Sequence, residues 1–429
     1  MLHVDKVDSL LTEKIRISAS NLKPLHCYMF YLKLYYERGL YNSFCVVEAD
    51  ENGYIDLKTA KPIRGTYHEA DQMGLFYSIH PSEEVRWGHY FRNSNGKPFI
   101  YKLSFLSYTE KVLDSVYLKK RWIHPAVTRI HVAQDGLYGT IFKPPGHGPF
   151  PCIIDVPGMN SVKLGTSNAE AFSQSGFLVY TMTMFDHKDL PKTIQKVNVE
   201  DYSRHIEFVK SLPYCSGKIG LYGTSFSGTL AIHLALKHPE ISAVVAVNGA
   251  ESFVKCQAYM KENGKSMNCA TFDPKLAEFV NGVNKQRGAF QTLFDSLKPE
   301  TSIQWDKIAK TVSFRIVASI DDWMFPAVNN ATRIRDNLVK TGHSVEMEFV
   351  TGGHSKNAPY FPHQPYAYNK FVKVALGFGG EASSLGKSQE KVWEKNLEFF
   401  RRKLGTPPSL PDYERETLIE KPENLKNKL

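Results

Sequence analysis

The 429-residue sequence has no apolar run of 18 or more residues, so it predicts no membrane-spanning helix. Its first residues, Met1–Asp8, include acidic side chains and no apolar core segment, unlike a secretory signal peptide. None of the six cysteines forms a C-x-x-C pair. We therefore expect free thiols in a reducing compartment rather than a disulfide framework.

Clustered charge is also lacking, although the net charge is +9. No basic run exceeds three residues, the length of Lys119–Arg121, and no nucleic-acid-binding module is recognisable, so we expect no nucleic-acid partner. We expect neither a cofactor nor a metal. The composition, 42% hydrophobic and 23% charged, is that of an ordinary globular protein, and the length predicts two domains or one large domain with additions.

Residues 1–125 are rich in β-branched and aromatic side chains, and turn signals such as Glu51-Asn52-Gly53 separate the runs. Several short strands at this spacing predict an all-β, immunoglobulin-like sandwich domain. The expected strands are Glu13–Ala19, Leu25–Tyr36, Leu40–Ala49, Leu75–Ile79 and Pro98–Tyr108.

Residues 126–405 alternate between apolar strands and helical patterns, which predicts a mostly parallel sheet covered on both faces. A hairpin around Asp135-Gly136 opens this domain. Residues 250–310 show no clear strand and are expected to be an insertion over the active site. Residues 406–429 are Pro-rich and charged, which predicts a disordered polar tail. The expected strands are Cys152–Val156, Phe177–Met184, Lys218–Tyr222, Ile241–Val247, Val312–Ala318 and Val345–Val350; the expected helices are Ala169–Gln174, Val199–Leu212, Thr229–Lys237, Ala327–Lys340 and Ser388–Leu404.

The segment Gly223–Gly228 lies between an expected strand and an expected helix. A serine between glycines in that setting is typical of a nucleophile elbow, and it makes Ser225 the candidate nucleophile. Ser227 stands where the strict motif has glycine. The alternative is a Gly/Ser-rich turn in which a serine caps an ordinary helix.

A catalytic serine needs a base, and the base needs an acid that fixes its tautomer. Two later strands run into such residues: one into Asp321-Asp322 and the other into Gly352-Gly353-His354. The chain order Ser, Asp, His is that of the hydrolase triad. His354 could instead be a surface loop residue, and one of the two aspartates could cap or neighbour the helix Ala327–Lys340.

An oxyanion hole should combine the N–H after the nucleophile with one from a loop after an early strand. The candidates are the N–H groups of Phe226 and of Met159, which follows Pro157-Gly158. A plain Pro-Gly turn is the alternative for the second donor.

Several stretches, in order along residues 10 to 404, resemble the acyl-CoA thioesterase and bile acid-CoA:amino acid N-acyltransferase family. The resemblance implies a β-sandwich followed by an α/β-hydrolase domain, with Ser225, Asp322 and His354 as nucleophile, acid and base. This chain departs from the family at Ser227, at Met159–Ser161 and at Ser319. The matching stretches are Gly65–Tyr67, Met73–Phe76, Pro144–Gly146, Gly148–Pro151, Ile153–Asp155, Asp189–Thr193, Val247–Gly249, Gly353-His354 and Pro359–Pro362.

The nucleophile separates two activities within that family, because the transferases resemble cysteine enzymes and the hydrolases serine enzymes. An acyl-serine is an oxoester that amines attack poorly, so Ser225 favours hydrolysis of acyl-CoA to fatty acid and CoA. The alternatives are transfer to glycine or taurine, an inactive acyl-CoA-binding homologue and a general carboxylesterase. The candidates for contacts with the CoA phosphates are Lys163, Lys188 and Lys192, and the alternative is that each is an ordinary surface lysine.

The last three residues, Asn427-Lys428-Leu429, resemble the peroxisomal Ser-Lys-Leu address with its first residue changed. They favour a peroxisomal location and an import receptor as partner, with the cytosol as the alternative.

Overall fold

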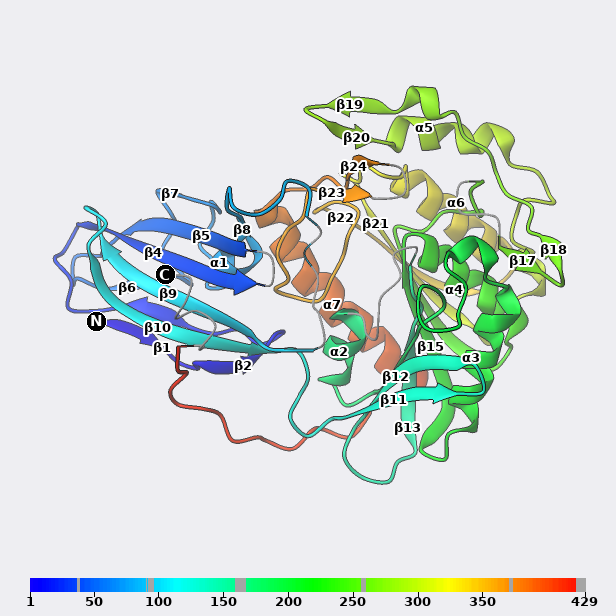
Figure 1. Ribbon diagram of the computed structural model, residues 1–429, viewed down its shortest axis with the longest axis horizontal. Helices are drawn as coiled ribbons and strands as arrows, with labels where there is room; N and C mark the ends of the chain where they lie inside the picture. Colours follow the sequence, from blue (N-terminus) through cyan, green and yellow to red (C-terminus); the bar gives the residue numbers. More distant parts are fainter. Residues whose placement is uncertain are drawn as a thin grey trace.

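The computed structural model describes residues 1–36, 39–89, 91, 96–158, 167–255, 260–369 and 373–421. Figure 1 shows a β-rich half, in blue and cyan, beside a half in which strands and helices alternate. The last strand of the first half ends at Arg121, and the first strand of the second begins at Thr128.

Two sheets form the first half, and the immunoglobulin-like arrangement stays a prediction. Phe30, Leu32 and Leu34 alternate along β4 (Cys27–Tyr36) and are buried, so one face of this strand packs against the core. The small sheet has the order β1 (Leu2–Val4), β3 (Ile17–Ala19), β6 (Ile55–Asp56); the large sheet has the order β2 (Asp8–Leu10), β10 (Val112–Arg121), β9 (Phe99–Ser107), β4 (Cys27–Tyr36), β5 (Gly39–Glu48), β7 (Arg64–Gly65), and β8 (His80–Pro81) also pairs with β5.

The expected strand Leu75–Ile79 is wrong, because the chain forms the short helix α1 (Gly74–Tyr77) there. The Asp71 side chain accepts a hydrogen bond from the Met73 N–H at 2.8 Å and starts the turn. All four residues of α1 are buried. The apolar run therefore reflects burial on every side, which sequence periodicity does not distinguish from a buried strand.

An eight-stranded sheet forms the centre of the second half. Its first two strands make the predicted hairpin around Asp135 and Gly136, whose φ angles are +52° and +72°. In the order given next, β14 and every strand after it run parallel to one another, so the carboxyl ends of these strands lie at one edge of the sheet. The order is β11 (Thr128–Gln134), β12 (Leu137–Lys143), β14 (Leu178–Met182), β13 (Phe150–Asp155), β15 (Cys215–Thr224), β16 (Ile241–Val247), β21 (Ser313–Ser319), β22 (Ser344–Val350).

Helices cover both faces of this sheet, as in the α/β-hydrolase fold. Successive strand residues point to opposite faces: Leu221 belongs to one buried cluster, whereas the Tyr222 ring packs against Phe172 at 5.0 Å in the other. One face carries α2 (Ser167–Ser173) and α7 (Ala382–Leu404); the other carries α3 (Val199–Ser211), α4 (Phe226–Lys237) and α6 (Ala327–Lys340).

The insertion between β16 and β21 consists of very short elements, which explains why no clear strand was expected there. Figure 1 shows β19, β20 and α5 at the periphery of the second half. A four-stranded sheet joins the insertion to the chain that follows β22, the last strand of the eight-stranded sheet. These elements are β17 (Lys261–Glu262), β18 (Lys265–Ser266), β19 (Glu278–Val280), β20 (Val283–Lys285) and α5 (Arg287–Gln291), and β20 pairs with β24 (Val374–Gly377), which pairs with β23 (Tyr366–Asn369).

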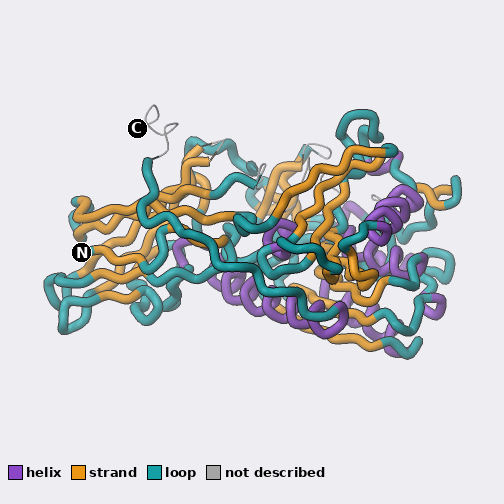
Figure 2. Tube along the Cα trace, turned by 90° about the horizontal axis from the view of Figure 1, so that it is seen from below, coloured by secondary structure: helices purple, strands orange, loops and turns teal. Residues whose placement is uncertain are grey.

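A continuous apolar core joins the two halves, which lie end to end in Figure 2. The Phe361 ring lies 5.8 Å from Trp122 and 5.4 Å from Phe91 of the first half. A Cβ on Gly386 of α7 would approach the Tyr77 ring to 2.3 Å, so glycine permits this close contact. Among the described residues, no helix is both long enough and apolar enough to cross a membrane.

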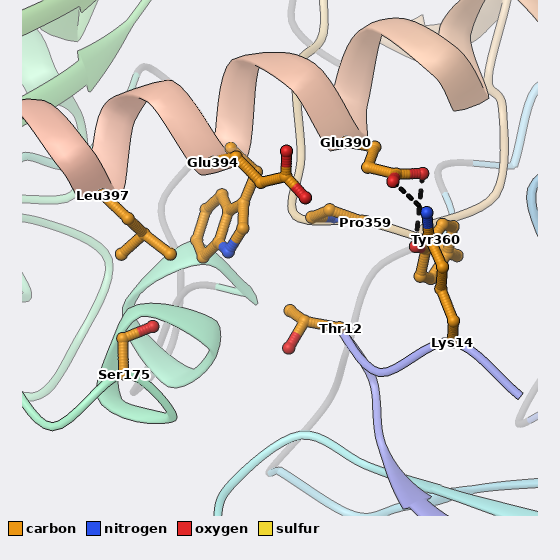
Figure 3. Close-up of a pocket in the computed structure, with 9 residues that line it drawn as sticks. Thr12, Lys14, Ser175, Pro359, Tyr360, Glu390, Glu394 and Leu397 are labelled. Carbon is orange, nitrogen blue, oxygen red and sulfur yellow. Dashed lines mark hydrogen bonds and ion pairs between the residues drawn. The ribbon is translucent and has the colours of Figure 1, made fainter. Parts of the chain in front are cut away.

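A cavity of about 350 Å³ opens at the junction of the halves. Figure 3 shows Lys14 and Glu390 pointing toward one another across its rim, where they form an ion pair. Glu394 and Leu397 of α7 face Thr12 across the cavity. None of the predicted catalytic side chains lines it.

Residues 406–421 differ from the disordered tail that we expected, because Pro407 and Pro408 lie against Gly176 of the second half and later residues bind the first half. The Arg415 guanidinium donates to both Glu13 carboxylate oxygens at 2.7 and 2.8 Å. The Glu416 N–H donates to the buried Asp8 carboxylate, which also pairs with Arg121 at 2.7 Å. The tail charges therefore have specific partners, and composition alone does not reveal them.

We expect Glu348→Gln to destabilise the fold by about 2 kcal/mol at pH 7. Burial alone would raise the pKa of Glu348, but hydrogen bonds from Lys391, Lys395 and the buried Arg315 lower it to about 2. The ionised carboxylate stabilises the fold above the unfolded pKa of about 4.5, and the contribution is lost as the pH falls through the folded pKa.

Urea unfolding at several pH values measures this effect, and the difference from wild type should shrink between pH 4.5 and 2. The matched control is Glu346→Gln on the same strand, because Glu346 forms an exposed pair with Arg402 and should contribute less than about 1 kcal/mol. Equal losses in the two variants would contradict the assignment.

Candidate active site

Ser225 occupies a strained turn between β15 and α4. Its φ and ψ are +61° and −127°, a conformation that side chains rarely adopt outside functional turns. The Ser225 N–H donates to the Val247 carbonyl at 2.8 Å, which fixes the turn to the neighbouring strand. A Cβ on Gly223 would lie 2.1 Å from the Ser227 carbonyl oxygen, so this turn excludes every other residue at position 223. The geometry is that of a nucleophile elbow.

Ser227, the departure from the strict motif, fits the elbow through its hydroxyl. Its Oγ accepts a hydrogen bond from the Thr224 N–H and donates one to the Thr224 carbonyl, both at 2.9 Å. The side chain is buried. The hydroxyl thus closes the turn on itself, where glycine would leave both backbone groups without this partner.

We expect Ser227→Ala to lower the free energy of unfolding by about 1–2 kcal/mol, because it leaves the Thr224 backbone groups without the hydroxyl. Chemical denaturation measures the change. The control is Ser211→Ala, whose exposed hydroxyl donates to the Phe208 carbonyl at the end of α3 and should contribute little. A neutral Ser227→Ala would show that water replaces the hydroxyl at no cost.

His354 and Asp322 form a buried pair at the same edge of the sheet. The His354 Nδ1 lies 2.7 Å from the Asp322 Oδ2, and both side chains are almost fully buried. The other carboxylate oxygen accepts the N–H groups of Met324 and Phe325 at 2.7 and 3.0 Å. In this arrangement Nδ1 carries a hydrogen and donates it to the carboxylate, which leaves Nε2 as the basic nitrogen.

Asp321 has a different partner and does not face the imidazole. Its two oxygens accept the N–H groups of Gly353 and Gly352 at 2.9 and 2.8 Å. Both glycines have positive φ angles, so this turn carrying His354 depends on them and on the carboxylate. Neither aspartate caps α6 through its side chain, and the N-cap residue there is Pro326.

Asn248 links the loops, although the sequence did not single it out as a site residue. Its amide nitrogen donates to the His354 carbonyl at 2.7 Å and to the Ser319 Oγ at 3.1 Å. Its amide oxygen accepts the Ser319 N–H at 2.7 Å. The buried amide therefore holds the loop that carries the base at the ends of β16 and β21, and Ser319 takes part in that contact.

Of the two predicted oxyanion donors, Phe226 lies within the described residues and Met159 does not. Phe226 begins α4 directly after Ser225, so its N–H belongs to the first turn of a helix. The helix dipole favours negative charge at that end. Met159 and Lys163 lie outside the described residues.

An apolar surface borders the base on the side of the insertion. The rings of Phe325 and Phe378 lie 5.5 and 6.2 Å from the His354 ring. Phe325 belongs to a buried cluster that includes Phe290 and Leu293 of the insertion. This side of the site therefore suits an apolar group.

Neither the predicted phosphate-binding Lys188 nor the cluster of possible metal ligands described below is among the contacts given above for Ser225, His354 and Asp322. The Lys188 ammonium sits over the Tyr138 ring at 5.0 Å. Within the described residues, one group of metal-ligand type comprises Glu207, His238 and Glu240, whose ligand atoms lie within 4.8 Å of one another. The Lys210 ammonium approaches Glu207 and Glu240 to 3.8 and 3.6 Å, so an ion-pair cluster accounts for this group.

Comparison with known proteins finds similar relatives over nearly the whole chain, among them the following three. Acyl-coenzyme A thioesterase 1 of Rattus norvegicus is 26% identical over 92% of this chain and 94% of its own. The peroxisomal succinyl-coenzyme A thioesterase of Mus musculus is 25% identical over 92% and 95%. The bile acid-CoA:amino acid N-acyltransferase of Mus musculus is 26% identical over 95% and 97%.

Two family models also match, and together they cover most of the chain. Residues 12–134 match the N-terminal region of acyl-CoA thioester hydrolases and bile acid-CoA:amino acid N-acyltransferases (BAAT). Residues 197–406 match the C-terminal region of the same proteins. The chain therefore belongs to the acyl-CoA thioester hydrolase and bile acid-CoA:amino acid N-acyltransferase family.

Proposed function

We propose that the protein hydrolyses acyl-CoA thioesters, with Ser225 as nucleophile, His354 as general base and Asp322 as the residue that orients the base. The observation that carries this proposal is the buried Asp322–His354 hydrogen bond at the sheet edge where the strained Ser225 elbow also lies. The three residues follow the carboxyl ends of parallel strands, as catalytic groups in such sheets do.

The reaction begins when the Ser225 Oγ attacks the thioester carbon and His354 Nε2 removes its proton. The N–H groups of Phe226 and Met159 are the proposed donors to the oxyanion. The C–S bond then breaks, His354 returns the proton to the CoA sulfur, and an acyl-serine remains. Water, deprotonated by His354, attacks this ester. The bond between the acyl carbon and the Ser225 Oγ breaks, His354 returns the proton to that Oγ, and the fatty acid leaves.

The apolar surface formed by Phe325, Phe378 and the insertion supports an acyl chain as the group on that side. Water is the proposed acceptor because an acyl-serine is an oxoester, which amines attack less readily than a thioester. Transfer to glycine or taurine is the second candidate, since one relative is named as a bile acid-CoA:amino acid N-acyltransferase.

Purified protein incubated with acyl-CoAs of several chain lengths should release free CoA, measured with a thiol reagent. Mass spectrometry of the same reactions with added glycine or taurine should show the free acid as the main product. An amide as the main product would favour the transferase. A fluorophosphonate probe should label Ser225, and absence of both labelling and turnover would leave only an acyl-CoA-binding homologue.

We propose a peroxisomal location on the resemblance of Asn427-Lys428-Leu429 to the import signal. These residues lie outside the described part of the chain, and one relative is named as peroxisomal. Deletion of the three residues should move a fluorescent fusion of the full chain from peroxisomes to the cytosol.

A further inference from the structure

A second cavity, of about 220 Å³, lies at the sheet edge that carries Ser225. Thr183 and Met184 line it directly after the carboxyl end of β14, as Ser225 directly follows β15. Only β13 separates these two strands in the sheet. Two strand spacings correspond to about 10 Å, so the cavity is close to the nucleophile but distinct from it.

The base of this cavity is apolar and its rim is cationic. Leu137 and Met184 are buried in its wall, whereas the side chains of Lys196 and Arg204 are exposed at its edge. The hairpin turn contributes Gly136, where a Cβ would meet only the Arg204 Nη2, at 4.0 Å. Glycine therefore leaves open space beside the guanidinium.

Asp201 is the one carboxylate that lines the cavity, and it already accepts hydrogen bonds at the N-terminus of α3. The Asp201 Oδ2 accepts the Asn198 N–H at 2.9 Å and lies 3.4 Å from the Asn198 Nδ2. Arg204 donates one N–H to the Asp135 carbonyl, and a guanidinium has five such donors. The two cations thus outnumber the single acid, which favours an anionic ligand at the rim.

We propose that this cavity binds the phosphorylated adenosine end of acyl-CoA, an inference that rests on the proposed thioester hydrolysis. The purine lies on the apolar base, and Lys196 and Arg204 hold the phosphates. Guanidinium groups suit phosphate because they donate two parallel hydrogen bonds. The volume is below that of a site for a whole drug-sized ligand, as expected for one end of a longer molecule.

In this placement the two ends of the substrate lie on opposite sides of Ser225. The acyl chain lies toward Phe325 and Phe378, near the strands β21 and β22. The nucleotide lies toward β14 and α3, and the pantetheine arm spans the distance between this cavity and the thioester over Ser225.

The test compares two substrates with the same acyl chain, acyl-CoA and acyl-pantetheine, which lacks the nucleotide. Lys196→Ala and Arg204→Ala should each raise the KM for acyl-CoA about tenfold with little change in kcat, because each removes a charged contact to phosphate. The KM for acyl-pantetheine should not change. The matched control is Lys210→Ala, an exposed lysine of α3 outside the cavity.

Isothermal calorimetry with adenosine 3′,5′-bisphosphate tests the cavity independently of turnover. Wild type and Lys210→Ala should bind this probe with similar affinity, and the other two variants about tenfold more weakly. Equal KM changes for both substrates, no change for either, or no binding of the bisphosphate would overturn the proposal. Bisphosphate binding without turnover of any thioester would reject the hydrolase and leave the nucleotide site standing.

Discussion

Ser225→Ala is expected to lower kcat for acyl-CoA hydrolysis by about 10⁴-fold or more while the fold stays intact. Removing the nucleophile of a Ser-His-Asp site eliminates the covalent route, and the remaining activity comes from the oxyanion donors and from substrate binding. Release of CoA measures the rate, and circular dichroism with thermal unfolding checks the fold. Fluorophosphonate labelling should disappear in the same variant.

The control for this substitution is Ser216→Ala, because Ser216 lies near the start of β15, at the opposite end of the strand. It should keep full activity. Ser225→Cys adds a second comparison, since an acyl-cysteine is a thioester and should pass more of its acyl group to glycine than the wild type does. Full CoA release from Ser225→Ala would remove the residue from the mechanism.

The strained turn at Ser225 and the positions of Asp322 and His354 after later strands could be predicted because short-range features specify them, and their catalytic roles stay proposals. Gly223 is required by the turn itself, and a strand precedes each candidate. The helix α6 (Ala327–Lys340) and the strand β16 (Ile241–Val247) have the bounds that the sequence predicted. Local pattern is sufficient for such elements because caps, turns and periodicity agree.

Features that depend on distant partners could not be predicted in the same way. The first turns of α7 precede the expected start at Ser388, and their Gly386 is a poor helix former that packs against Tyr77. The tail is ordered by partners about 400 residues away, such as the contact of Arg415 with Glu13. Likewise, Lys196 and Arg204 line the same cavity as Gly136, which is about 60 residues or more away in the sequence.

The two adjacent aspartates show the same limit at the site. Sequence pattern alone did not choose between Asp321 and Asp322, and the family resemblance favoured Asp322. Their hydrogen bonds differ, because Asp322 contacts the His354 imidazole whereas Asp321 accepts backbone N–H groups of the glycine turn. The pair therefore offers a matched experiment, in which the same chemical change is made at neighbouring positions.

Asp322→Asn is expected to lower kcat by about 10³- to 10⁴-fold with little change in KM. An amide at this position donates toward Nδ1 and favours the wrong imidazole tautomer, which leaves His354 without its basic Nε2. Asp321→Asn should cost about tenfold or less, because its amide oxygen still accepts one of the two N–H groups of Gly352 and Gly353. Steady-state kinetics on both variants, with thermal unfolding as a check of the fold, measures the ratio. Equal losses would mean that the two carboxylates act only by holding the loop, and a larger loss at Asp321 would reverse the assignment of the acid.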